Sequence, residues 1–175
     1  LADGDLLFLY RHGHSGNGNT MLNRYDVATG KWSIVQHPLI SGEGERNAYT
    51  NQIAVDSKGA WHISWCWRES GDVASNHDIC YARSSDGGRS WQKSTSEFYE
   101  LPITSANAEY IWRIPQGSEL INQTSMTVDC DDRPVVATYW RAPDSNVVQY
   151  RLVYHDGRRW RTAQVGERKS PFSLS

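Results

Sequence analysis

The sequence predicts an all-β fold made of repeated four-stranded antiparallel sheets, and three observations support this prediction. Short runs rich in β-branched and aromatic residues alternate with turn signals along the chain. One segment recurs without a gap 73 residues later, and a tryptophan marker recurs with a similar period. No helical periodicity of useful length competes with the strands.

The repeated segment runs from Val55 to Arg68 and again from Val128 to Arg141. Both copies begin with Val-Asp and end with Trp-Arg, and a shorter copy at Gly4–Arg11 also ends in an aromatic residue followed by Arg. A second marker is the Trp that follows each polar turn, at Trp32, Trp91 and Trp160. Because the two markers share one period of about 60 to 70 residues, they indicate structural repeats.

Each repeat contains four predicted strands. In the second repeat these are NQIAVD, AWHISWCWR, HDICYARS and SWQKS. A four-stranded unit that repeats radially is a propeller blade, so we expect a partial β-propeller of about three blades. The predicted bounds are about 1–40 for blade 1, about 41–101 for blade 2, about 108–166 for blade 3 and 167–175 for the start of the next blade. An ordinary all-β sandwich is the alternative.

Composition excludes two classes of partner. The chain has 18 basic and 20 acidic residues, a balance that does not fit a nucleic-acid binder. No apolar run approaches the roughly 18 to 20 residues of a membrane span, and the first residues lack the pattern of a secretory signal. We therefore expect neither nucleic acid nor a membrane as partner.

For the aromatic residues and the cysteines, we favour a structural role over a functional one. The 8 Trp and 9 Tyr, against 3 Phe, suit packed sheets and also sugar stacking, and we favour packing for any single Trp. Cys66, Cys80 and Cys130 cannot all pair, and none has metal or redox spacing. Cys66 and Cys80 could face each other across a hairpin, but free thiols acting as small hydrophobes are the favoured interpretation.

The segment SSDGGRSW, Ser84–Trp91, resembles the Asp box of BNR-repeat and sialidase-like proteins, with Ser90 in place of the usual Thr. The longer strings RNAYTNQIAVDSKGAWHISWCWRES, NHDICYARSSDGGRSW and VVATYWR are similar to the BNR-4 group, which includes lyases acting on ulvan and related uronate-rich polymers. The resemblance covers nearly the whole chain. It implies a ring that usually has seven blades, and a secreted or periplasmic location.

Propeller blades place the second-to-third-strand loops and the blade connections on one common face, where polar residues of this chain collect. Arg binds carboxylates bidentately and amides serve hydroxyls, so we expect an acidic polysaccharide or oligosaccharide there. The predicted substrate-binding residues are Arg46, Asn47, Tyr49, Arg68, Asn76, Asn122, Gln123 and Arg141. For the Arg that recurs in every blade, at positions 11, 68 and 141, a structural role is the favoured alternative.

The lyases that the chain resembles use His, Tyr and Arg to remove the C5 proton of a uronate, protonate the leaving oxygen and offset the carboxylate charge. By position in the motifs, the resemblance implies His77 as base, Tyr139 as acid or second base, and Arg151 as carboxylate partner. His77 is not demanded by the repeat, and Tyr139 stands where Cys66 stands in the previous blade.

The leading hypothesis is therefore part of a uronate-polysaccharide lyase of the ulvan type, acting by β-elimination. A carbohydrate-binding or architectural propeller without catalysis is the alternative, and a sialidase-like hydrolase, prompted by WRIP at 112–115, ranks lower. No metal ligands are assigned, although a structural or charge-neutralising ion stays open because His12 and His14 lie two apart. Open blade faces predict that further blades, or other copies of the chain, cover them.

Overall fold

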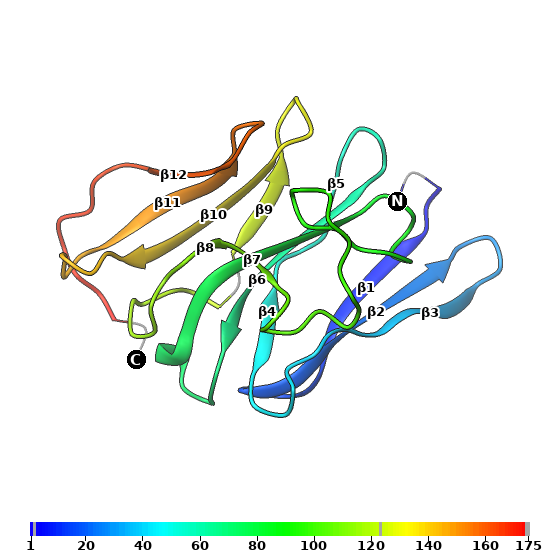
Figure 1. Ribbon diagram of the computed structural model, residues 1–175, viewed down its shortest axis with the longest axis horizontal. Helices are drawn as coiled ribbons and strands as arrows, with labels where there is room; N and C mark the ends of the chain where they lie inside the picture. Colours follow the sequence, from blue (N-terminus) through cyan, green and yellow to red (C-terminus); the bar gives the residue numbers. More distant parts are fainter. Residues whose placement is uncertain (2, 123, 174–175) are drawn as a thin grey trace.

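A computed structural model of the chain describes residues 1, 3–122 and 124–173 and contains three antiparallel sheets that follow one another along the chain (Figure 1). Sheet 1 has the order β1 (Leu6–His14), β2 (Asn17–Asp26), β3 (Lys31–Ile40). Sheet 2 has the order β4 (Asn47–Thr50), β6 (Trp61–Arg68), β7 (Asn76–Ser84), β8 (Glu109–Trp112), with β5 (Ala54–Val55) also paired to β6. Sheet 3 has the order β12 (Trp160–Gln164), β11 (Val148–His155), β10 (Pro134–Arg141), β9 (Ser125–Val128).

The middle sheet is buried on both faces because each neighbouring sheet packs against one of them. Every residue of β6 is buried, and alternate residues of a strand point to opposite faces. The first core cluster joins sheets 1 and 2 through Leu22, Leu39, Trp61, Ile63, Trp65, Trp67 and Trp91. The second joins sheets 2 and 3 through Cys66, Ile79, Tyr81, Val136, Trp140 and Val153. The sheets are thus consecutive blades of a partial propeller, as the repeats predict.

The tryptophan markers lie in three successive repeats of this arrangement. Trp32 pairs with Tyr25 at the start of β3, and Trp160 pairs with His155 at the start of β12. Trp91 directly precedes Gln92, which forms an isolated bridge with Arg83 of β7. The indoles of Trp91 and Trp160 pack against the preceding sheet, whereas Trp32 is 54% exposed on the open face of sheet 1.

The predicted strand SWQKS is wrong, because only Gln92 pairs with β7. Trp91 is fully buried, and its Nε1 donates a hydrogen bond to the carbonyl of Gly88. The chain then folds back on itself, and Gln92 also bridges Phe98. The edge of sheet 2 is formed instead by β8, so residues 109–112 belong to the second sheet and not to blade 3, where the predicted boundary at 108 put them.

Sheet 1 contains three strands within the described residues rather than the expected four. The strands equivalent to β1 in the other two sheets are β6 and β10. On its inner side β6 pairs with β4 and β5, and β10 pairs with β9. β1 pairs with β2 and lies at the sheet edge. No helix in the described part of the chain is long and apolar enough to cross a membrane.

The cysteines are free thiols, as favoured from the sequence. Cys80 stands opposite Trp65 in the β6–β7 pair, so their side chains share a face of sheet 2. Cys66 follows Trp65 along β6, so its side chain points to the other face. The two buried thiols therefore belong to different core clusters. Cys130 is exposed in the turn before β10.

Candidate functional site

Polar side chains gather at one end of the sheets, where strands of all three repeats terminate. The residue pairs Arg68–Asn76 and Arg141–Val148 lie at the ends of the β6–β7 and β10–β11 hairpins, and β1 ends with Arg11 to His14. The Asp-box turn around Asp86 follows the other end of β7. We call the first of these ends the polar rim; it runs along the lower and left sides of the view in Figure 1.

Tyr49 lies between two guanidinium groups at the polar rim. Its hydroxyl accepts hydrogen bonds from Nη1 of Arg11 at 3.0 Å and Nη1 of Arg68 at 3.3 Å. The hydroxyl of Ser15 lies 2.9 Å from the same oxygen. Both guanidinium carbons also lie over the phenol ring, at 5.3 Å and 5.2 Å from its centroid. Two cations from different sheets therefore converge on one phenol oxygen.

Strand pairing explains why these groups meet. Tyr49 stands opposite Cys66 in the β4–β6 pair, so its side chain shares a face with Cys66 and with Arg68 two residues on. Arg11, near the end of β1, reaches the phenol from sheet 1. Partial burial favours the neutral phenol, but the hydrogen bonds with Ser15 and Arg11 and the two positive charges outweigh it, and the pKa of Tyr49 is lowered.

Arg68 is buried and holds the Tyr49 hydroxyl and its own loop in place. It is 7% exposed and donates to the carbonyls of Ser70 and Gly71 as well as to Tyr49. Its Nη1 also donates to Oδ1 of Asn122 at 3.2 Å, and Nδ2 of Asn76 donates to the same oxygen at 2.7 Å. Four of the predicted substrate-binding residues, Tyr49, Arg68, Asn76 and Asn122, thus form one hydrogen-bonded cluster.

His77 lies between two carboxylates. Its Nε2 is 2.7 Å from Oε1 of Glu69, and its Nδ1 is 3.0 Å from Oδ2 of Asp78. Glu69 in turn accepts two hydrogen bonds from Nε of Arg46, and Asp78 pairs with Nη1 of Arg113 at 2.9 Å. The result is a chain of alternating charges across the rim.

This environment favours the charged imidazolium. Burial opposes protonation of His77, but the hydrogen bonds and charges of Asp78 and Glu69 outweigh burial and raise its pKa. The pKa of Asp78 is lowered, because bonds from His77, from the backbone N–H of Ile114 and from Arg113 outweigh desolvation. As a base, His77 would have to release one of its carboxylate partners.

Two hollows open at the polar rim, one on each side of sheet 2. The first, of about 300 Å³, lies between sheets 1 and 2. Its lining includes Arg11, Gly13, Thr20, Ala48 and Tyr49. The second, of about 540 Å³, lies between sheets 2 and 3, and its lining includes His77, Asp78, Arg113, Gln116 and Pro143. Each hollow has an exposed guanidinium, that of Arg11 in the first and of Arg113, 68% exposed, in the second.

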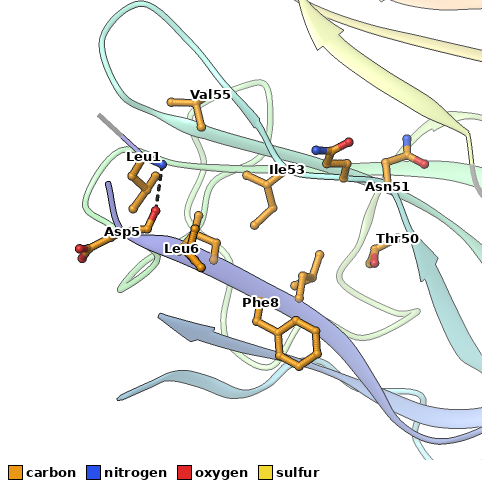
Figure 2. A pocket seen from close by; sticks show the side chains of 11 residues that line it. Leu1, Asp5, Leu6, Phe8, Thr50, Asn51, Ile53 and Val55 are labelled. Atoms are coloured by element: carbon orange, nitrogen blue, oxygen red, sulfur yellow. Dashed lines mark hydrogen bonds between the residues drawn. The ribbon is translucent and has the colours of Figure 1, made fainter. Parts of the chain in front are cut away.

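A third hollow, of about 460 Å³, lies along the free edge of β1 (Figure 2). Leu6 and Phe8 come from β1, and Thr50, Asn51, Ile53 and Val55 come from the inner strand segment of sheet 2. Its described lining contains no Arg, Lys or His side chain. This hollow therefore lacks the cationic side chains that line the two hollows at the rim.

The structure places Tyr139 and Arg151 in sheet 3. Both line a hollow of about 360 Å³ with Tyr150 and Leu152. Arg151 stands opposite Thr138, so its side chain leaves the sheet on the face opposite to that of Tyr139. Its guanidinium lies over the ring of Trp140, 4.8 Å from the centroid. Tyr139 packs against Tyr150 and Phe172, and burial raises its pKa.

No hydrogen bond or ion pair within the described residues joins His77 to Tyr139 or Arg151. The three predicted catalytic residues occupy two different sheets, His77 on β7 and the others on β10 and β11. Their joint role in one catalytic centre stays a prediction.

The remaining predicted substrate-binding residues hold the rim together. Arg46 bonds Glu69, Glu43 and Ser105, and the buried Asn47 accepts from the backbone N–H of Gly16. Arg141 donates to the carbonyl of Ser145 in its own hairpin loop, as Arg68 does in its loop, and also to the carbonyl of Gly117. Gln123 lies outside the described residues.

The sequence interpretation placed Glu69 and Arg113 on the polar face but assigned no binding or catalytic role to them or to Asp78. Asp78 follows His77 directly in the NHD string, but its positive φ of 57°, which turns the backbone there, is not readable from the string. Among the described residues, no group of three or more His, Cys, Asp or Glu side chains is arranged to hold a metal ion.

Solved structures that share this fold include polysaccharide lyases. A PL25 ulvan lyase matches with a TM-score of 0.76 and 14% identity, covering 98% of this chain and 43% of that one. The same kind of lyase bound to a -[GlcA(1-4)Rha3S]- oligosaccharide matches with a TM-score of 0.72 and 14% identity, covering 93% of this chain and 41% of that one. Polysaccharide lyase Uly1 matches with a TM-score of 0.66 and 18% identity, covering 93% and 38%.

This chain spans less than half the length of these lyases, and at such identities the likeness concerns the fold. No curated protein sequence matches the chain. The model of a BNR repeat-containing family, by contrast, matches residues 1–168, nearly the whole chain. Together with the three consecutive blades and the Asp-box turn, this match shows that the chain belongs to the BNR_4 family of BNR repeat-containing proteins.

Proposed function

We propose that the chain is part of a carbohydrate-active propeller that binds a uronate-rich polysaccharide at its polar rim and cleaves it by β-elimination. The observation that carries this proposal is the pair of rim hollows, each with an exposed guanidinium, on either side of sheet 2. A polymer with recurring carboxylates presents anions at intervals along its length. Such a polymer fits two separated cationic hollows better than a single compact ligand would.

Hydrogen-bonding groups in the hollows suit sugar hydroxyls. Gln116 lines the hollow of Arg113, and the partly buried Tyr49 lines the hollow of Arg11. His77, whose pKa is raised by Asp78 and Glu69, lines the same hollow as Arg113. Such an array offsets the uronate carboxylate, and it does so most strongly as the charge delocalises when the C5 proton leaves.

The likeness of the fold to polysaccharide lyases supports a lyase as the proposed function. The solved structures that share the fold include ulvan lyases, one of them with a glucuronate-containing oligosaccharide bound. Ulvan itself as the substrate, a secreted or periplasmic location, and the roles of His77, Tyr139 and Arg151 as base, acid and carboxylate partner stay predictions.

The test of the proposal is the formation of unsaturated uronate from polymers such as ulvan and glucuronan, followed by ultraviolet absorbance. We expect an absorbing product with at least one of these polymers. Polymer binding without any product would select the alternative, a carbohydrate-binding propeller without catalysis.

The contribution of the exposed guanidinium is measured by Arg113→Gln. Loss of a charge-assisted hydrogen bond costs about 1.5 to 3 kcal/mol, so we expect polymer affinity to fall by roughly 10- to 100-fold. The matched control is Arg89→Gln, an exposed arginine in the Asp-box turn away from the polar rim. Equal losses in the two variants, measured by isothermal titration calorimetry, would mean that the attraction is general and not specific to the rim.

A further inference from the structure

We infer that Tyr49, which the sequence predicted only as a substrate-binding residue, is the proton acceptor of the β-elimination, an inference that rests on the proposed function. It takes the place of the predicted base His77, because both ring nitrogens of His77 contact carboxylates. The phenol oxygen is within hydrogen-bond distance of two guanidinium groups, 3.0 Å from Arg11 and 3.3 Å from Arg68. Both cations also lie over the ring. Two positive charges at one oxygen stabilise the phenolate, which is the form that accepts a proton.

The clamp on the phenol is built to persist without substrate. Arg68 is buried and fixed by the carbonyls of Ser70 and Gly71 and by Asn122. Asn122 is fixed in turn by Asn76, whose Nδ2 also donates to the carbonyl of Leu120. The phenol therefore meets at least one cation whose position does not depend on the ligand, as a preorganised site requires.

The phenol also has access to a substrate. Tyr49 is only partly buried and lines the rim hollow of about 300 Å³ together with the exposed Arg11. The groups that face its hydroxyl are Arg11 from β1, Ser15 from the β1–β2 turn and Arg68 from β6. The lowered pKa of Tyr49 is consistent with this geometry.

The proposed step balances without a cofactor. The Tyr49 phenolate takes the proton from C5 of a uronate whose carboxylate pairs with Arg11, and the C5–H electron pair becomes the C4–C5 double bond. The C4–O bond breaks, its electron pair goes to the leaving oxygen, and that oxygen takes a proton from solvent water to become a hydroxyl. The Tyr49 phenol then returns its proton to the hydroxide so formed. The products are a 4,5-unsaturated uronate end and a shortened chain.

The role of Tyr49 in catalysis is tested by measuring the turnover of a uronate polymer by the Tyr49→Phe variant. Because general-base catalysis contributes typically 10²- to 10⁴-fold, we expect turnover to fall by at least about 100-fold while polymer binding is retained. The matched control is Tyr25→Phe, which changes a tyrosine paired with Trp32 at the far end of sheet 1 and should leave turnover unchanged.

A spectroscopic titration tests the phenolate directly. The tyrosinate absorbance of the protein minus that of Tyr49→Phe isolates one group, which should ionise below the ordinary value of about 10. Replacing Arg11 in Arg11→Gln should move that ionisation, and the rising limb of the pH–rate profile, to higher pH. A Tyr49 that ionises at or above its ordinary value overturns the inference, as does turnover that survives Tyr49→Phe. Absence of turnover in the unmodified chain on all uronate polymers overturns the proposed function instead.

Discussion

At the scale of single residues, the polar rim differs from an ordinary surface because neighbouring charged side chains of sheet 2 form a continuous series of ion pairs. His77 is the clearest case, since both ring nitrogens contact a carboxylate and each carboxylate contacts an arginine. The buried His62 shows the contrast: burial outweighs its bond to Asp56, and its pKa is lowered. The surroundings of two histidines in one chain therefore shift their pKa values in opposite directions.

The raised pKa of His77 predicts a pH-dependent contribution to stability. A histidine whose folded pKa lies above the ordinary value of about 6.5 stabilises the fold fully below that value, and the stabilisation is lost as pH rises through the folded pKa. The loss of unfolding free energy caused by His77→Gln should therefore be larger near pH 6 than near pH 9. The difference grows with the gap between the pKa of His77 in the folded state and its pKa in the unfolded state.

Urea unfolding of the wild type and His77→Gln at the two pH values measures this difference. Glu69→Gln serves as the partner variant, because it removes one of the two carboxylates and should weaken the pH dependence without removing the imidazole. A loss that is the same at both pH values would contradict the raised pKa of His77.

At the scale of elements, the Asp-box turn is fixed by close approach between neighbouring sheets. The Asp86 carboxylate accepts from the backbone N–H and the hydroxyl of Ser90, and Gly88 brings the backbone against sheet 1. A Cβ at Gly88 would lie 2.8 Å from Val35 and 2.9 Å from Trp61. Its neighbour Gly87 also has a positive φ, but no atom lies within 4 Å of an added Cβ there. The turn thus contains two glycines with different physical reasons.

This contrast predicts different costs for two adjacent substitutions. Gly87→Ala should destabilise the fold by about 1 to 2 kcal/mol, the price of a left-handed backbone with a side chain. Gly88→Ala should cost a further 1 to 3 kcal/mol or so, because the new methyl group overlaps the packed core. Chemical denaturation of both variants decides the matter, and equal losses would show that sheet 1 can move away from the turn.

At the scale of the whole molecule, the outer face of sheet 1 is the largest departure from a closed core. Leu6, Phe8, Trp32 and Ile34 are each more than half exposed. Their aromatic rings contact one another, with Phe8 stacked on Tyr10 at 4.9 Å and edge-on to Trp32 at 6.1 Å. Exposed apolar faces of this kind drive association, and the free edge of β1 beside the hollow of Figure 2 adds unpaired backbone groups.

The chain by itself is therefore expected to associate in solution through this face. Ile34→Lys places a charge at the most exposed of the four residues, 68%, and should shift the population toward monomer with little change in stability. Phe98→Lys is the control, since Phe98 is 63% exposed but lies on the loop after the Asp box, away from sheet 1's outer face. Light scattering that finds the unmodified chain monomeric would remove this expectation.

The sequence by itself determined the fold class, the period and the chemistry available at the rim. The signals used were local: alternation in segments such as WHISWCWR, the recurring Trp-Arg endings and the Asp box. Local signals can be interpreted without knowledge of tertiary contacts. They predicted three consecutive blades and, through loop position, the grouping of Tyr49, Arg68, Asn76 and Asn122.

Only the tertiary structure decided which of these groups act together. The fourth strand of sheet 2 is β8 and not SWQKS, because burial of Trp91 turns the chain away from β7. The pairing of Thr138 with Arg151 separates the Tyr139 and Arg151 side chains onto opposite faces. The two cations at Tyr49 come from strands 38 and 19 residues away in the chain. Such convergence depends on register and on packing between sheets, which no spacing of residues in the sequence encodes.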